Sequence, residues 1–242
     1  MLRRTRIALK KFIAAIGLLS AELIVVLCLF ILSISLFSFL VKQIFIDKQE
    51  QFDHNVFKWL EQLVTPFNTS VMEFITFLGT HTFLIPANLV LVGYFLFIRR
   101  HRWYSIKVVA IALSSTAMMF LLKAFFSRAR PLVPLLRPAL GYSFPSGHSF
   151  MSFAFYGLLI YLAYKYLETV WLKWTIIVAL ASLILLIGFS RIYLRVHYAS
   201  DVLAGFAVGI IWLSFSLWML RKMEKYSQRK IEPVVEEEVQ PE

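Results

Sequence analysis

Three short stretches of polar residues combine fixed positive charge with two histidines and one aspartate. They read, in chain order, as K-x6-R-P from Lys123 to Pro131, P-S-G-H from Pro145 to His148 and S-R-x5-H-x3-D from Ser190 to Asp201. Transfer of a phosphoryl group needs cations around the phosphorus, a nucleophile and a proton donor. The three clusters hold side chains of each kind.

The cations of these clusters could form a cage for phosphate. Lys123, Arg130 and Arg191 supply positive charge, and arginine forks match phosphate oxygens bidentately. Ser146 is placed to cap a helix, whose free N–H groups and dipole bind anions. Gly147 lets the backbone approach the anion closely. We interpret these residues as a site for a pentacoordinate phosphoryl group.

The histidines could carry the covalent step. His197 and Asp201 are four residues apart and share one face of a helical turn. Asp201 can hold one ring nitrogen of His197 as N–H, which leaves the other nitrogen free to attack phosphorus. His148 would protonate the leaving oxygen and later activate water. The clusters offer no carboxylate and histidine set for a two-metal site, so we expect neither metal nor cofactor.

The elements that must position these clusters are membrane helices. The chain has 242 residues, of which 60% are hydrophobic and 16% charged. A helix needs about 20 apolar residues, and at least roughly 17, to cross the hydrocarbon core. Six uncharged stretches are candidates: 23–41, 82–98, 108–122, 149–164, 174–190 and 202–220. The third and fourth reach this length only when extended to Trp103 and Phe144, with Lys107 snorkelling to the interface.

The basic residues indicate how these helices are oriented. Most of the 25 lysines and arginines gather at the two ends of the chain and in the loops after the second and fourth stretches. Such loops face the cytoplasm. We therefore expect a multi-pass protein of the cell membrane with both termini cytoplasmic and the three clusters on the periplasmic or exterior face. The net charge of +11 then reflects topology and phosphate binding, not nucleic acid.

The remaining segments complete an all-α fold, a six-transmembrane helix bundle in one domain over residues 1–230. Segment 43–73 is expected to be an amphipathic helix on the membrane surface, either a packing lid or a substrate entry. Its apolar residues recur at helical spacing, namely Phe52, Val56, Leu60, Leu63 and Phe67. The charged residues between them are Asp53, Lys58 and Glu61. Prolines make the segment before the P-S-G-H cluster irregular. Residues 231–242 form an acidic tail that we expect to be disordered.

The three motifs together resemble the type 2 phosphatidic acid phosphatase superfamily, in its bacterial membrane branch. The resemblance covers residues 123–201 by motif and the whole chain by topology. It implies that His197 is the nucleophile, that Asp201 orients it and that His148 is the general acid. It also implies that five residues bind the phosphate, namely Lys123, Arg130, Ser146, Gly147 and Arg191.

The resemblance implies hydrolysis of a lipid phosphate monoester or pyrophosphate, such as phosphatidate, phosphatidylglycerophosphate or undecaprenyl pyrophosphate. Two alternatives stay open at this point. One is a lipid-linked phosphotransferase with the same phosphohistidine, and the other is a non-catalytic protein that binds or transports anionic lipids. Nothing in the sequence implies an obligatory protein partner. Arg128, Arg137 and Arg195 lie outside the motif pattern. They could contact a second phosphate or lipid headgroups, but we expect them to contact the membrane interface.

Overall fold

The computed structural model describes residues 2–135 and 141–231, and within these residues every regular element is a helix. Their bounds are α1 Leu2–Val41, η1 Lys42–Ile46, α2 Gln51–Glu61, α3 Pro66–Phe77, α4 His81–Gly93, η2 Tyr94–Ile98, α5 Arg102–Phe126, α6 Gly147–Tyr166, α7 Val170–Tyr193, α8 Ala199–Tyr226 and η3 Ser227–Ile231. The predicted all-α fold is confirmed. The predictions for Arg137 and for the acidic tail fall on residues outside the described ranges.

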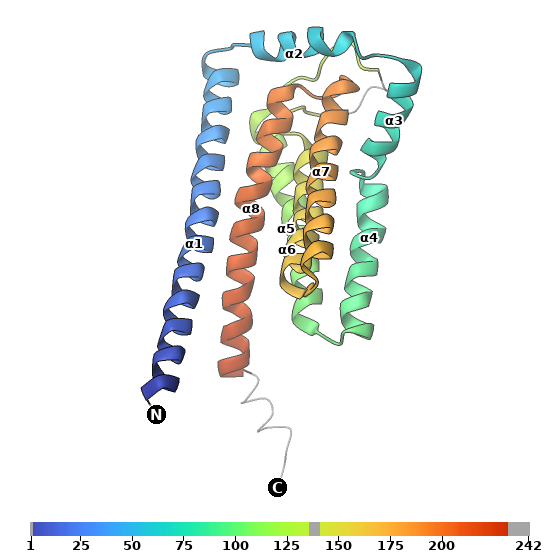
Figure 1. The fold of residues 1–242 in the computed structure, drawn as a ribbon. Helices are drawn as coiled ribbons and strands as arrows, with labels where there is room; N and C mark the ends of the chain where they lie inside the picture. Colours follow the sequence, from blue (N-terminus) through green and yellow to red (C-terminus); the bar gives the residue numbers. More distant parts are fainter. Residues whose placement is uncertain (1, 136–140, 232–242) are drawn as a thin grey trace.

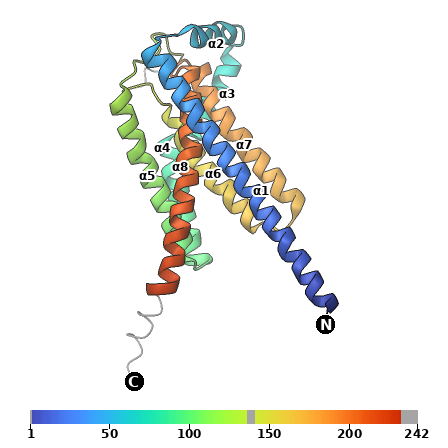
Figure 2. The same cartoon turned by 90° about the vertical axis from the view of Figure 1, so that its left-hand side faces the viewer.

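The long helices run side by side along one axis, and α2 lies across one end of them (Figure 1). We call this the α2 end. The first described residues of α1 and the last residues of α8 lie at the opposite end, which we call the terminal end. Helix α6 packs against α5, α7 and α8, while α1 contacts α8 and leans away from the other helices toward its N-terminus (Figure 2). The centre of the bundle is therefore α6, whose first turn holds the P-S-G-H motif.

Within the residues that the structure describes, five helical stretches are long and apolar enough to cross a membrane. They are Leu23–Ile46, Pro66–Ile98, Arg102–Phe126, Val170–Tyr193 and Ala199–Arg229. The central helix α6 is not among them, because its serines, tyrosines and His148 lower its hydropathy. A helix enclosed by three others faces protein instead of lipid, so it does not need an apolar surface all round. The multi-pass membrane architecture holds, and the count of six spans stays a prediction.

The prediction of one surface helix over 43–73 is wrong in its extent. Helix α2 ends at Glu61, and a second helix, α3, begins at Pro66 and leads into α4 through a turn at 78–80. Thr65 caps α3 by accepting a hydrogen bond from the Asn68 amide at 3.1 Å, and proline suits the first helical position. The second membrane stretch therefore starts well before residue 82.

The prediction that Lys107 snorkels to the interface is also wrong. Its side chain is 1% exposed, and its ammonium donates to a Glu224 carboxylate oxygen at 2.7 Å. The same ammonium lies 4.5 Å from the centre of the Tyr104 ring, whose hydroxyl accepts a hydrogen bond from Lys165. A charge within a helix bundle is stabilised by a partner when it cannot reach water. We call Tyr104, Lys107, Lys165 and Glu224 the terminal-end cluster.

Candidate active site

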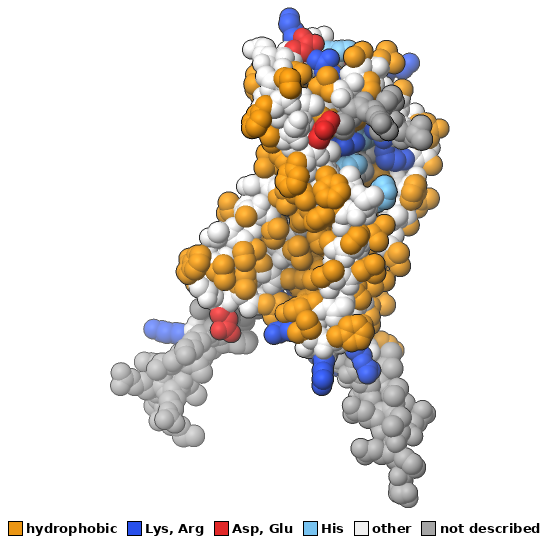
Figure 3. Space-filling model, turned by 90° about the vertical axis from the view of Figure 1, so that its right-hand side faces the viewer, with side chains coloured by type: hydrophobic (Ala, Val, Ile, Leu, Met, Phe, Trp, Pro, Cys, Tyr) orange, Lys and Arg blue, Asp and Glu red, His pale blue; other side chains and the backbone are white. Residues whose placement is uncertain are grey.

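The three sequence motifs meet at the α2 end of the bundle. Lys123 lies in the last turn of α5, Arg191 in the last turn of α7, and His148 in the first turn of α6. Arg130 belongs to the segment between α5 and α6, and His197 to the short turn between α7 and α8. A space-filling view shows lysine, arginine and histidine side chains gathered near this end, above a broad hydrophobic surface (Figure 3).

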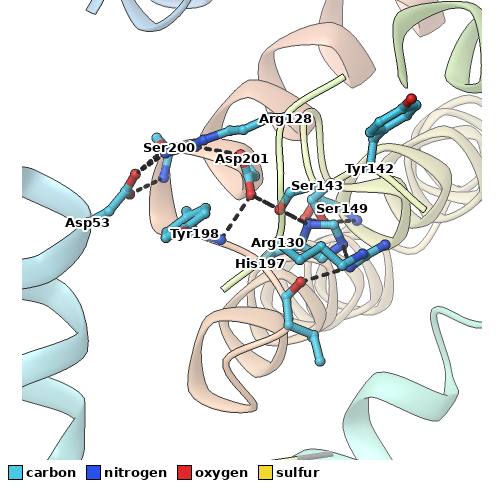
Figure 4. A network of polar contacts seen from close by, with 12 residues as sticks. Asp53, Arg128, Arg130, Tyr142, Ser143, Ser149, His197, Tyr198, Ser200 and Asp201 are labelled. Carbon is cyan, nitrogen blue, oxygen red and sulfur yellow. Dashed lines mark hydrogen bonds and ion pairs between the residues drawn. The ribbon is translucent and has the colours of Figure 1, made fainter. Parts of the chain in front are cut away.

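His197 is buried, and both of its ring nitrogens have polar neighbours. Nε2 lies 3.2 Å from Nη1 of Arg130, and Nδ1 lies 3.3 Å from the hydroxyl of Ser143. Asp201 approaches Nδ1 less closely, at 3.6 Å from its Oδ2. The Ser143 hydroxyl donates to that same oxygen, so it lies between the two predicted partners (Figure 4). The expected pairing of His197 with Asp201 thus includes a serine that the motif pattern does not name.

This arrangement favours one protonation state of His197. Because the Ser143 hydroxyl donates its hydrogen bond to Asp201, its oxygen can accept a hydrogen bond from the Nδ1–H group of His197. The proton then sits on Nδ1, and the Nε2 lone pair accepts from Arg130. Burial is the main reason that the pKa of His197 is lowered from 6.5 to about 4; Asp201 opposes this shift, and Arg191 and Arg130 add to it. The ring is therefore neutral at pH 7 with Nε2 able to act as a nucleophile.

Asp201 is held from several directions. Its Oδ2 accepts from the Tyr198 amide at 2.9 Å, which forms a capping box at the start of α8. Its Oδ1 accepts from Nη1 of Arg128 at 2.7 Å. The carboxylate therefore caps a helix and also faces the histidine, so Asp201 can serve the fold and orient the ring at the same time.

Arg128 does not contact the membrane interface, and that prediction is wrong. Its guanidinium is buried, and its Nη2 donates to Oδ2 of Asp53 on α2 at 2.9 Å. Asp53 also accepts from the amide and hydroxyl of Ser200, at 2.9 Å and 2.6 Å. The sequence held one signal for this contact. Asp53 precedes the buried Leu60 by seven residues, which places both side chains on the same face of α2.

The predicted phosphate-binding cations lie around the histidines and are held by hydrogen bonds to neighbouring oxygens. Lys123 donates to the Tyr142 carbonyl at 2.5 Å, and Arg130 donates to the carbonyls of Gly141 and Val196 at 2.9 Å and 2.8 Å. Nη1 of the buried Arg191 donates to the Thr76 hydroxyl at 2.7 Å. Among the described residues, neither Lys123 nor Arg191 forms an ion pair. Arg195, by contrast, pairs with Glu61.

Two polar atoms of the motif residues are buried and lack a hydrogen-bond partner within the described part of the chain, namely Nε2 of His148 and Nε of Arg191. Outside the motifs, the hydroxyls of Ser115 and Ser152 are also buried without a partner there. A buried polar atom without a partner is costly, and native proteins keep few of them. His148 is close enough to Arg191, His197 and Arg130 to interact with their charges. The unpartnered atoms of His148 and Arg191 therefore belong to the same cluster and fit an anionic ligand.

The start of α6 is fixed beside this cluster. The Ser146 hydroxyl accepts from the Ser149 amide at 3.4 Å and the Ser149 hydroxyl at 3.0 Å, so the predicted cap is present. The Ser146 amide donates to the Asp201 carbonyl at 2.9 Å, which ties α6 to α8. Gly205 of α8 permits this approach, because a Cβ there would lie 2.7 Å from the Ser146 carbonyl oxygen. A Cβ added at Gly147 would lie 3.7 Å from the Met119 sulfur and 3.8 Å from Lys123 Cε, so packing against these side chains does not require glycine there.

Metal ligation has no obvious place in this arrangement. Over the described ranges, no three His, Cys, Asp or Glu side chains are grouped so that they could hold a metal ion. The structure brings His148, Lys123, Arg130 and Arg191 around His197 and Asp201, as the motifs predicted. Their catalytic and binding roles stay predictions, as does the absence of a metal from the reaction.

Comparison with known proteins places this architecture in a family. The family model described as the PAP2 superfamily matches residues 103–225. Phosphatidylglycerophosphatase B of Bacillus subtilis (strain 168) is 31% identical over 166 residues, which are 68% of this chain and 81% of that protein.

Two solved structures are also similar. The crystal structure of a transmembrane PAP2-type phosphatidylglycerolphosphate phosphatase from Bacillus subtilis has a TM-score of 0.71 and 27% identity, covering 78% of this chain and 96% of that one. The crystal structure of Aquifex aeolicus LpxE has a TM-score of 0.54 and 27% identity, covering 68% and 93%.

Proposed function

Since the chain belongs to the PAP2 superfamily as a multi-pass membrane lipid phosphatase, we propose that it hydrolyses its substrate through a phosphohistidine on His197. One observation carries this proposal above the others. Two buried polar atoms, on His148 and Arg191, lack partners beside a neutral His197. An oxyanion placed among these three residues would satisfy both atoms and lie within reach of the nucleophile.

In the first step, the Nε2 lone pair of His197 attacks phosphorus and the bond to the lipid oxygen breaks. His148 takes up a proton as the phosphate anion binds beside it, and it gives this proton to the leaving alkoxide. The imidazole gains positive charge as the P–N bond forms, and Asp201 stabilises this charge through Ser143 and directly. The guanidinium of Arg191 lies where it can donate to the equatorial oxygens.

In the second step, His148 accepts a proton from water while the water oxygen attacks phosphorus. The P–N bond then breaks, inorganic phosphate is formed, and Nε2 of His197 regains its lone pair. Neither step requires a metal ion, because Lys123, Arg130, Arg191 and the α6 N-terminus can offset the phosphate charge. The binding roles of Ser146 and Gly147 are to shape that helix terminus.

We place the site on the periplasmic or exterior face and both termini in the cytoplasm. Two observations support this orientation. The basic loops favour a cytoplasmic terminal end, and the motifs gather at the opposite, α2 end (Figure 1). A substrate lipid would then reach the site from the outer leaflet. Phosphatidylglycerophosphate is the first candidate, because the matched Bacillus subtilis protein is a phosphatidylglycerophosphatase.

The test is phosphate release by purified protein with EDTA present. The panel contains phosphatidate, phosphatidylglycerophosphate, undecaprenyl pyrophosphate and a soluble monoester, each measured beside His197→Ala. We expect one lipid to be preferred and turnover to fall by at least about 10⁴-fold in the variant, because the nucleophile is lost. Near-normal rates in His197→Ala would exclude this nucleophile, and activity that requires added magnesium would exclude the metal-free mechanism.

The product distinguishes hydrolysis from transfer. With a substrate labelled in the phosphate, we expect all of the label in inorganic phosphate and, after rapid quenching, an acid-labile label on the protein that His197→Ala lacks. Label on a second lipid or alcohol would instead identify a phosphotransferase with the same intermediate.

A further inference from the structure

Asp53 is an acidic residue on a surface helix, yet its side chain is only 2% exposed. It lies on α2, far in the sequence from the three motifs, and its carboxylate points toward α8 (Figure 4). Apolar side chains of the same helix, Val56 and Leu60, already pack against the bundle. This apolar packing is sufficient to hold α2 on the bundle. A buried carboxylate is not needed for that purpose, and its removal from water costs free energy.

Arg128 joins this carboxylate to the candidate active site. Its two terminal nitrogens are divided between two acids, with Nη2 on Asp53 at 2.9 Å and Nη1 on Asp201 at 2.7 Å. The guanidinium also lies over the ring of Tyr198, 4.1 Å from its centre. Ser200 completes the junction, since its hydroxyl and amide donate to Asp53 and Arg128 donates to the hydroxyl.

The divided fork acts together with the Tyr198 amide to set which oxygen of Asp201 faces the histidine. Arg128 donates only to Oδ1, so Oδ2 is left to accept from Tyr198 and Ser143 and to face Nδ1 of His197. An arginine beside a single carboxylate tends to bind it with both nitrogens. Without Asp53, the Arg128 fork can take both oxygens of Asp201 and turn Oδ2 away from Ser143.

We propose that Asp53 is a positioning residue of the phosphatase, which holds Arg128 in a divided contact and thereby sets the orientation of Asp201 toward His197. The proposal rests on the roles proposed above for His197 and Asp201. It makes the docking of α2 part of the catalytic arrangement, so that the rate of the chemical step depends on a helix outside the motifs.

The chain offers a matched control on the same helix. Glu61 of α2 pairs with Arg195 at 3.0 Å, and its side chain is 61% exposed. Both ion pairs connect α2 to segments next to the site, and both lose one negative charge when the acid becomes an amide. Only the Asp53 pair continues to Asp201.

The experiment compares Asp53→Asn with Glu61→Gln in the full-length protein in detergent. Values of kcat and KM are measured with a lipid phosphate in mixed micelles and with a soluble monoester, and thermal unfolding is followed in parallel. We expect Asp53→Asn to lower kcat at least roughly tenfold on both substrates with KM little changed, since a charged hydrogen bond is lost. Glu61→Gln should stay within about twofold of the wild type.

The proposal would be overturned if the two variants had equal kcat. It would also be overturned if Asp53→Asn raised only KM for the lipid and left kcat unchanged, because α2 would then act in lipid binding. A double-mutant cycle with Arg128→Met supplies an independent readout. If Asp53 acts through Arg128, adding Asp53→Asn to Arg128→Met lowers kcat no further. Additive losses would contradict the proposed route.

If Asp53→Asn does not fold, Ser200→Ala removes one hydroxyl from the same junction, and a kcat equal to that of the wild type would then count against the proposal. The His197→Ala variant is measured in the same series as a control. If it keeps the turnover of the wild type, the proposed function itself is refuted, and the comparison of the α2 variants no longer bears on it.

Discussion

The bundle buries charged side chains at both of its ends, and the two groups differ in how completely they are paired. In the terminal-end cluster, Lys107 pairs with Glu224 and Lys165 donates to Tyr104. At the α2 end, His148 and Arg191 each keep a buried polar atom that lacks a partner among the described residues. Both ends lie next to apolar helices, so burial alone does not separate them.

The polar groups of the terminal-end cluster find their partners within the protein, whereas those at the α2 end leave two positions for a ligand to fill. Buried polar groups are normally satisfied, so an unsatisfied group indicates either strain or a missing ligand. The α2 end contains both kinds of contact. Arg128 is paired with two carboxylates, whereas the neighbouring Arg191 bonds to a threonine hydroxyl and has no carboxylate partner in the described ranges. We infer that the paired arginine positions the site and that the other one binds phosphate.

Among the variants that test this comparison of the two ends, His148→Ala should have the largest effect. Turnover should fall about 10²–10⁴-fold, because the general acid is removed. Thermal stability should stay equal or rise, because the variant removes a buried nitrogen without a partner. Parallel measurements of kcat and of the unfolding temperature in detergent test both statements. A clear loss of stability would mean that His148 is part of the structural framework.

The converse is expected at the terminal end. Lys107→Met leaves the Glu224 carboxylate without its partner and should destabilise the protein by about 3–5 kcal/mol, as for other broken buried pairs. Its kcat should equal that of the wild type once the folded fraction is taken into account. Denaturant titration and turnover are compared with the double variant Lys107→Met/Glu224→Gln, which should recover part of the stability. A specific loss of kcat would show that the two ends are coupled.

A smaller effect is expected from Ser143→Ala, which removes the hydroxyl between His197 and Asp201. We expect kcat to fall roughly tenfold with KM little changed, because Asp201 can still contact Nδ1 directly but holds the ring less firmly. Steady-state kinetics on a soluble monoester would measure this. An unchanged kcat would remove Ser143 from the catalytic arrangement.

The last prediction concerns the protonation of His197 in the substrate-free protein. Histidine ¹⁵N NMR should show a neutral ring with its proton on Nδ1 from pH 7 to near pH 5, since burial lowers the pKa of His197 to about 4. Unfolded His197 would titrate near 6.5, so the unfolded chain binds more protons between these values. Its contribution to stability is complete above pH 6.5 and is lost as the pH falls toward 4. Protonation near pH 6.5 in the folded protein would contradict the burial argument.

Several features of this protein follow from its sequence alone. Long apolar runs predict membrane helices from their length, and the short spacings within each motif place His197 beside Asp201 and Ser146 at the start of α6. These are local properties that depend on neighbouring residues only. They also indicated the family, to which the chain belongs.

Other features depend on how the helices pack. The sequence did not show that Lys107 would meet Glu224, that Arg128 would meet Asp53, or that Ser143 would lie between His197 and Asp201. A charged residue on a helix faces either lipid, water or a neighbour according to the rotation and tilt of the whole helix. That rotation is set by the summed packing of the bundle, so only the tertiary structure decided which charges are paired and which are left for a ligand.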